Sequence, residues 1–221
     1  MNNKIIQFGE NVEGYDVPVL NERELRAAAG LYFLPLFVSL MMVLFKGNLT
    51  MVKYIVTFFM VDFIIRIFVN PKFSPSLILA RLIVGRQNPE YVGAPQKKFA
   101  WWIGLVLAVL MFIHIVIINA YSVISGLSCM SCLLFLFFES AFGICIGCKI
   151  YALFNKGKVQ YCPGEVCEPL SKQAIQKISG VQLLIVIASI IFMLIVAYFF
   201  KENFSQSPVN LWKIISSQVG S

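Results

Sequence analysis

The hydrophobic positions of this chain fall into long apolar runs that short polar segments separate. The runs cover residues 30–45, 51–69, 101–124, 129–154 and 181–200. A helix needs roughly 20 consecutive apolar residues to cross the hydrocarbon core of a bilayer. The first run reaches this length only if Ala27 to Ala29 join it. The pattern therefore predicts an all-α, polytopic integral membrane helix bundle with about five transmembrane helices.

The polar segments divide the chain around this bundle. We expect residues 1–29 to form a cytoplasmic N-terminal tail without a cleavable signal peptide, because the segment lacks an apolar core. Asn21, which acidic residues follow, predicts the start of a helix that leads into the membrane. Residues 30–200 form a single transmembrane domain, and residues 201–221 form a C-terminal tail with Trp212 as an interfacial anchor.

One short helix and one tight turn are expected between the spans. Ser74 followed by Pro75 has the form of an N-cap with proline at the first helical position. The apolar stretch 76–84 that follows is too short to span, so we expect it to lie at the membrane interface. Gly126 and Ser128 are expected to form the turn between the third and fourth spans.

Composition agrees with a membrane protein. Hydrophobic residues make up 59% of the chain and charged residues 13%, whereas a soluble domain carries roughly 25% charged residues. The net charge of +7 comes from Lys and Arg in the short segments between apolar runs. That distribution is typical of membrane orientation signals and not of a nucleic-acid-binding face. The lipid bilayer is the expected partner, and nucleic acid is not.

The basic residues also predict an orientation. The N-terminal tail and the segments after the second and fourth runs together hold 13 Lys and Arg, and the other side holds 4, when Lys149 and Lys53 at the membrane edges are counted with their adjoining segments. Cytoplasmic segments carry the excess of Lys and Arg in such proteins. We therefore expect a multi-pass protein with a cytoplasmic N-terminus.

All six cysteines occur in close pairs. They are Cys129 with Cys132, Cys145 with Cys148, and Cys162 with Cys167. Free cysteine is also a common buried residue, so packing is the alternative explanation for the first two pairs. The third pair lies in a polar loop, where packing explains little. The second and third pairs are expected on one side, where four thiols suit either zinc or an iron–sulfur cluster or a dithiol–disulfide relay.

Helix electrostatics separates the pairs further. If residues 129–154 form one helix, Cys129 and Cys132 lie at its N-terminus behind Ser128, where the helix dipole favours thiolate. Cys145 and Cys148 then approach its C-terminus, where thiolate is disfavoured. The first pair is expected to be the more reactive one, on the oxidising side of the membrane, and to be disulfide-bonded or redox-active.

Four segments resemble one protein family. They are Val19-Leu-Asn-Glu-Arg23, Gly93-Ala-Pro-Gln-Lys97, Cys145-Ile-Gly-Cys148-Lys-Ile-Tyr151 and Cys162-Pro-Gly-Glu-Val-Cys167-Glu168. This set is similar to a family of bacterial integral membrane proteins known only as a domain of unknown function. The resemblance implies a place in the bacterial inner membrane. It also implies thiol or sulfur chemistry, with a thioredoxin-like or sulfurtransferase-like protein as partner.

Ionisable residues inside the apolar runs are candidates for function, because charge at membrane depth is costly. Asp62 and Arg66 are four residues apart and are expected to pair on one helix, with Arg66 reaching toward the cytoplasmic surface. His114 and Glu139 are expected at similar depth if the chain turns near Gly126. They would then form a hydrogen-bonded pair, a proton relay or a ligand pair, and a structural histidine is the alternative.

Three functions follow from these residues. The first is a thiol–disulfide oxidoreductase that uses the paired cysteines. A C-x-x-C at a helix end with a second pair in a loop resembles the arrangement in membrane disulfide-forming enzymes of the vitamin K epoxide reductase type, which hold a quinone. The second is a metal site built from Cys145, Cys148, Cys162 and Cys167. The third is a transporter of a small sulfur species or metal ion, working as a homo-oligomer with Asp62, His114 and Glu139 along its path.

Overall fold

The structure is a computed structural model that describes residues 8–154, 178–210 and 215. Four of its helices are long and apolar enough to cross a membrane. They are α1 (Glu22–Lys46), α4 (Ala94–Met111) with its π-helical continuation η3 (Phe112–Ile117), α5 (Val123–Phe142) and α7 (Gly180–Phe199). A fifth helix, α2 (Thr50–Ile64), continues into the π-helix η1 (Ile65–Val69) and covers the expected second span. The prediction of an all-α membrane bundle is confirmed.

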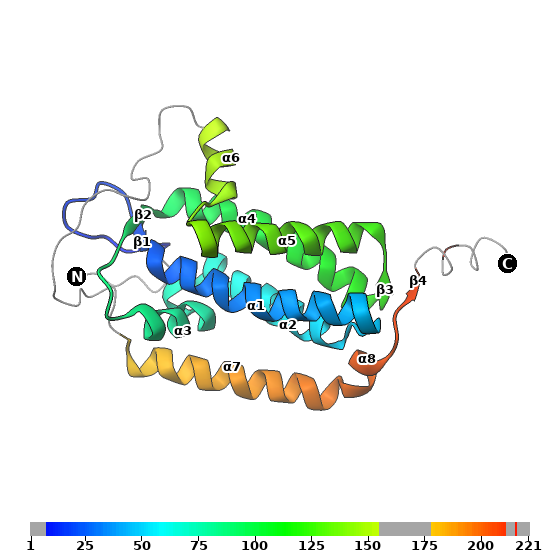
Figure 1. Ribbon diagram of the computed structural model, residues 1–221. Coiled ribbons are helices and arrows are strands. Elements are labelled where there is room, and N and C mark those ends of the chain that lie inside the picture. The colour runs from blue at the N-terminus through cyan, green and yellow to red at the C-terminus, as the bar shows by residue number, and fades with distance from the viewer. Residues whose placement is uncertain (1–7, 155–177, 211–214, 216–221) are drawn as a thin grey trace.

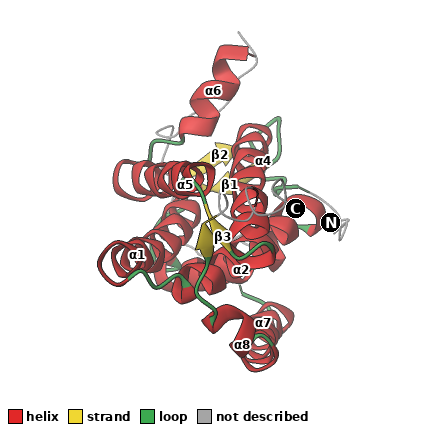
Figure 2. Cartoon of the chain, turned by 90° about the vertical axis from the view of Figure 1, so that its right-hand side faces the viewer, coloured by secondary structure: helices red, strands yellow, loops and turns green. Residues whose placement is uncertain are grey.

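The long helices lie side by side and run alternately in opposite directions (Figure 1). α1 packs against α5, and α4 packs against α2 and α5, around a core that includes Tyr32, Phe59, Phe63 and Trp101. α7 lies at the edge of this group, next to the short helix α3 (Pro75–Val84) (Figures 1 and 2). The start of α1 and the end of α7 lie at opposite ends of the bundle (Figure 1).

Two small sheets connect segments at opposite ends of the bundle. β1 (Val19–Asn21) pairs antiparallel with β2 (Tyr91–Gly93), which places the starts of α1 and α4 side by side. β3 (Ala120–Tyr121) pairs with β4 (Val209–Asn210) at the other end, after the short helix α8 (Lys201–Ser205). Buried Lys53 reinforces that second end, since its Nζ donates 2.7 Å to Asn119 Oδ1.

Both helix starts expected from the sequence are present. The side chain of Asn21 accepts from the Arg23 amide at the start of α1. Ser74 caps α3 and accepts from the Leu77 amide, with Pro75 in the first turn, after a short 3-10 helix η2 (Pro71–Phe73). The bounds of α3 agree with the expected interfacial helix. However, Ile78 is fully buried, so α3 is packed into the bundle beside α1 and does not lie alone on its surface.

The expected turn at Gly126 and Ser128 is wrong. The chain turns at residues 118–122, and α5 then begins with a capping box in which Ser122 and Ser125 bond each other's backbone amides. A capping box satisfies two of the free amides at a helix start, so it outweighs a glycine later in the sequence. Gly126 and Ser128 therefore lie inside α5.

The predicted end of the fourth span, at residue 154, is also wrong. The run 129–154 is divided between two helices. Gly143 has φ +66° and ends α5, with its amide donating 3.1 Å to Glu139 O and the Ile144 amide donating 3.0 Å to Phe138 O. The bond from the Gly143 amide to Glu139 is the 5→1 bond of an αL C-cap, which needs a left-handed residue. A separate helix, α6 (Ile146–Phe154), follows and projects away from the bundle axis (Figure 1).

Candidate functional site

The break at Gly143 places Cys145 at the beginning of α6. The Cys145 sulfur accepts 3.3 Å from the Cys148 amide and lies 2.6 Å from the Cys148 sulfur. Both thiols are free and partly buried. This position is a helix N-terminus, where unpaired amides and the helix dipole stabilise a thiolate. The expectation that this pair lies at a helix C-terminus is therefore wrong, because it assumed one unbroken helix.

Two glycines in this segment are required by close packing. A Cβ at Gly143 would overlap the guanidinium of Arg26 on α1. A Cβ at Gly147 would overlap Ala100 on α4. Gly143 thus leaves room for the Arg26 side chain at the end of α5, and Gly147 allows α6 to lie directly on α4.

A buried ionic cluster lies behind Cys145. Lys97 is 1% exposed, and its Nζ lies 2.8 Å from Glu22 Oε2 and 2.9 Å from Glu139 Oε1. Arg26 lies 3.6 Å from the other Glu22 oxygen. Glu22 starts α1 and Lys97 lies in the first turns of α4, so the β1–β2 pairing brings them together. Buried charges need such partners, because an isolated one is strongly disfavoured.

The electrostatics of the pair separates its two thiols. The pKa of Cys145 is lowered from its ordinary value, chiefly because the Cys148 thiol donates a hydrogen bond to the Cys145 sulfur. The positive charge of Lys97 lowers this pKa further. The same hydrogen bond raises the pKa of Cys148, and burial adds to that effect. Of the two thiols, Cys145 is therefore the one that ionises more readily, and Cys148 is the one that holds its proton more tightly.

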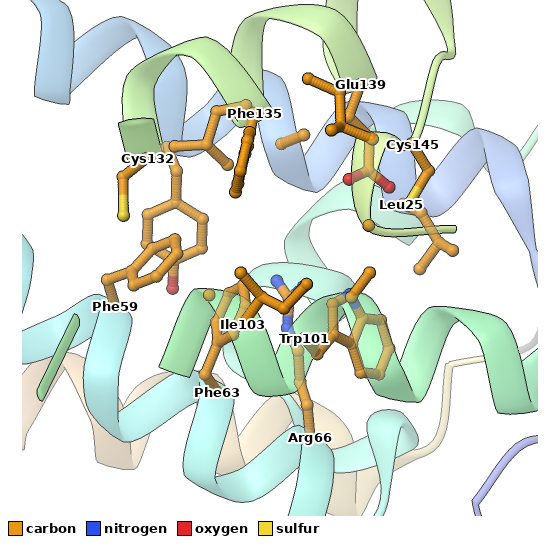
Figure 3. Close-up of a pocket in the computed structure, with 17 residues that line it drawn as sticks. Leu25, Phe59, Phe63, Arg66, Trp101, Ile103, Cys132, Phe135, Glu139 and Cys145 are labelled. Carbon is orange, nitrogen blue, oxygen red and sulfur yellow. The ribbon is translucent and has the colours of Figure 1, made fainter. Parts of the chain in front are cut away.

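Cys145 faces a small cavity inside the bundle. The cavity has a volume of about 50 Å³, and its walls include Arg66, Trp101, Cys132 and Glu139. Figure 3 shows Glu139 and Cys145 at one end of this space, Cys132 at the other, and Arg66 reaching into it from below. The cavity therefore brings together the sulfur of Cys145, a carboxylate and a guanidinium within mostly aromatic and aliphatic walls.

Arg66 is fixed by a second buried network. Its Nε lies 2.9 Å from Asp62 Oδ2, and its Nη2 donates 2.5 Å to Ser76 Oγ. Ser74 and Ser76 each donate 2.6 Å to the Asp62 carboxylate, so Asp62 also anchors the start of α3. The predicted pairing of Asp62 with Arg66 is confirmed. The predicted reach of Arg66 to the surface is wrong: it is 4% exposed, because the serines and Trp101 hold it inside.

His114 and Glu139 do not meet. His114 lies in η3 near one end of the bundle, where its Nδ1 is 2.8 Å from Leu110 O, and Glu139 lies at the other end with Lys97. The expectation failed because the turn between α4 and α5 precedes Gly126. Residues of α5 therefore lie beside residues of α4 other than those that a turn near Gly126 would bring level with them. Asp62, His114 and Glu139 therefore lie in three separate places and do not line one path.

The other cysteines differ from expectation or lie outside the description. Cys129 and Cys132 are free, buried thiols inside α5, not a disulfide at its start. The first turn of α5 begins at Val123, so these thiols lie beyond the free amides of that helix end. Cys162, Cys167 and Trp212 lie outside the described residues. The residues that the structure describes contain no cluster of three metal-ligating side chains.

The sequence interpretation missed Lys97 and Glu22. Both stand at the start of an apolar helix, where a charged residue usually faces water or headgroups. Their proximity depends on the β1–β2 pairing of three residues each, which is too short to recognise from sequence. The one usable signal was the lone carboxylate of Glu139, which needed a cation that the sequence alone did not locate.

Comparison with known proteins assigns a family. Residues 20–156 match the family described as Domain of unknown function (DUF4395). The chain belongs to this family. The match confirms the resemblance seen in the sequence and covers the region from Glu22 to Cys148. No curated protein and no solved structure matches the chain, so its function is inferred from the geometry of the site.

Proposed function

We propose that this family member is a membrane thiol–disulfide oxidoreductase in which Cys145 is the nucleophile and Cys148 the second thiol. One observation carries the proposal: Cys145 stands at the N-terminus of α6, with the Cys148 sulfur 2.6 Å away. A thiolate at a helix start, with a second thiol one turn later, is suited to disulfide exchange. The buried cation of Lys97 supports the same role.

The exchange follows from the two thiols. The Cys145 thiolate attacks one sulfur of a partner disulfide, so a mixed disulfide forms and one partner thiolate leaves. Cys148 then attacks the Cys145 sulfur and its proton passes to the departing partner sulfur, so the partner leaves as a dithiol once its first thiolate is protonated by water, and a Cys145–Cys148 disulfide remains. The reverse sequence oxidises a partner dithiol. Cys162 and Cys167 remain the predicted internal partner pair, with a thioredoxin-like or sulfurtransferase-like protein as the external partner.

The proposed setting is the bacterial inner membrane with a cytoplasmic N-terminus. Its support is the clustering of basic residues at the Cys145 end of the bundle, including Arg23, Arg26, Lys97 and Lys98. Such an excess is typical of the cytoplasmic side. A soluble partner would therefore meet Cys145 from the cytoplasm.

The test is equilibration of the purified protein in glutathione buffers of graded redox ratio. Mass mapping of alkylated cysteines should show Cys145 and Cys148 passing together between dithiol and disulfide. Metal analysis of the same sample covers the alternative: four protected cysteines with stoichiometric zinc or iron would replace the redox proposal by a metal site. Six thiols that never pair at any redox ratio would also rule out the proposed exchange.

A further inference from the structure

The cavity beside Cys145 presents hydrogen-bonding groups to a guest. Arg66 is 96% removed from solvent, uses Nε and Nη2 for Asp62 and Ser76, and lines the cavity beside Trp101. The Glu139 carboxylate enters the same space from above, next to Cys145 (Figure 3). A guest would therefore meet a donor, an acceptor and a nucleophilic sulfur together.

The size of the cavity restricts that guest. A volume of about 50 Å³ is enough for a few water-sized centres, since one such centre needs roughly 10–15 Å³. Pockets for drug-sized ligands measure about 300–1,000 Å³, so a quinone ring or a peptide does not fit this space. The guest has only a few heavy atoms, and it must be an electrophile to react with the Cys145 thiolate.

We propose that the cavity binds hydrogen peroxide and that Cys145 reduces it, which makes a small hydroperoxide a direct oxidant of the Cys145–Cys148 pair. Hydrogen peroxide has two heavy atoms, both of which donate and accept hydrogen bonds, and so matches Arg66 and Glu139 together. This inference rests on the proposed function, because it uses the same two thiols. It adds the substrate class that would oxidise them.

The reaction balances with the groups present. The Cys145 thiol passes its proton to Glu139, and the thiolate attacks one peroxide oxygen; the O–O bond breaks, an S–O bond forms, and the departing hydroxide takes the proton from Glu139 to become water. Cys148 then attacks the Cys145 sulfenic acid. An S–S bond forms, the S–O bond breaks, and the hydroxyl leaves with the Cys148 proton as a second water. Two thiols and one peroxide thus become one disulfide and two waters.

The experiment uses the reduced, purified protein and follows Cys145–Cys148 disulfide formation by mass mapping. Hydrogen peroxide and bulky cumene hydroperoxide are compared as oxidants. We expect hydrogen peroxide to react about a hundredfold faster or more, since misplacing reacting atoms by about 1 Å costs that much. Ala29→Leu places extra carbons in the cavity and should slow hydrogen peroxide by about the same factor, whereas Ala141→Leu, on the exposed face of α5, should not.

Each outcome separates this inference from the proposed function. Equal rates for the two peroxides, or first oxidation at Cys132, would overturn the peroxide site even if the protein equilibrates normally with glutathione. An unchanged rate in a folded Ala29→Leu variant would do the same. If Ala29→Leu does not fold, the comparison of the two peroxides on the unaltered chain still decides the matter. Failure to equilibrate with glutathione would instead count against the exchange chemistry itself.

Discussion

The two described cysteine pairs have the same spacing and opposite surroundings. Cys129 and Cys132 lie inside α5, 6% and 5% exposed, against apolar residues such as Leu133 and Leu136. Cys145 and Cys148 lie at the start of α6, beside the Lys97 cluster. The spacing of three residues therefore does not by itself tell which cysteine pair is suited to react. The position of a helix start and the presence of a buried cation distinguish the pair that is proposed to react from the pair that packs in the core.

The difference also shows why burial alone does not define a site. Desolvation disfavours a thiolate at both pairs. At Cys145 three effects oppose it: the thiol and amide of Cys148 donate to the sulfur, and Lys97 supplies positive charge. Around Cys129 and Cys132 the structure shows an apolar core. The contrast can be tested by changing one of these effects at a time.

The largest expected effect comes from removing the nucleophile. Cys145→Ser should abolish disulfide exchange with glutathione, because serine cannot form the mixed disulfide. Cys129→Ser, the matched change in the buried pair at a thiol that does not line the cavity, should leave the exchange rate essentially unchanged. The measurement is the rate of mixed-disulfide formation by mass. Equal losses in both variants would contradict the division of roles between the pairs.

Removing the buried cation should have the next largest effect. Lys97→Met leaves Glu22 and Glu139 buried together without their main partner, and breaking a buried ion pair in this way costs about 3–5 kcal/mol of stability. It should also raise the pKa of Cys145, since Lys97 contributes to lowering it. Thermal unfolding in detergent and the pH profile of alkylation measure the two effects.

The neighbouring lysine is the control for that change. Lys98 is partly exposed and its ammonium lies over Phe8, so Lys98→Met should change stability by less than about 1 kcal/mol. If Lys97→Met and Lys98→Met behave alike, the buried cluster does not support the site.

The helix break can be tested with two glycines. Gly143→Ala places a side chain at φ +66° and against Arg26, which should cost about 1–2 kcal/mol or more. Gly126→Ala lies inside α5 with nothing within 4 Å of its new Cβ and should stabilise by up to about 1 kcal/mol. Opposite shifts in melting temperature are expected; shifts of the same sign would mean that α5 does not end at Gly143.

The smallest effect concerns the pH dependence of the pair. Because the pKa of Cys145 is lowered, its thiolate should persist at lower pH than that of an ordinary thiol, and alkylation should stay fast further into acid. Cys148→Ala removes the thiol that donates to Cys145, so the alkylation profile should move to higher pH. The readout is the rate of iodoacetamide labelling at Cys145 across pH. A profile that does not move would show that Cys148 does not stabilise the thiolate.

Much of the candidate site could not be read from the chain. The cysteine pair itself was found, because its spacing is visible in the sequence. The effect of the helix dipole on this pair was predicted with the wrong sign. Gly143-Ile-Cys145 is apolar enough to continue a hydrophobic run, so the pair was placed near a helix C-terminus and not at a helix N-terminus. Lys97 and Glu139 are 42 residues apart, and their contact depends on where the α4–α5 turn lies. An error of a few residues in that turn was enough to pair Glu139 with His114 instead.

The sequence by itself determined the class of the protein, the order of its long apolar helices, the starts of α1 and α3, and the Asp62–Arg66 pair. These features are local: bilayer thickness sets the length of each run, and caps and i,i+4 pairs act within one or two turns. Only the tertiary structure decided where the fourth run breaks, which carboxylates surround Lys97 and which cysteines line the cavity. Those features depend on contacts between helices, and these contacts are set by the register of the helices and the positions of the turns. An apolar run is hydrophobic on all faces, so its sequence specifies neither.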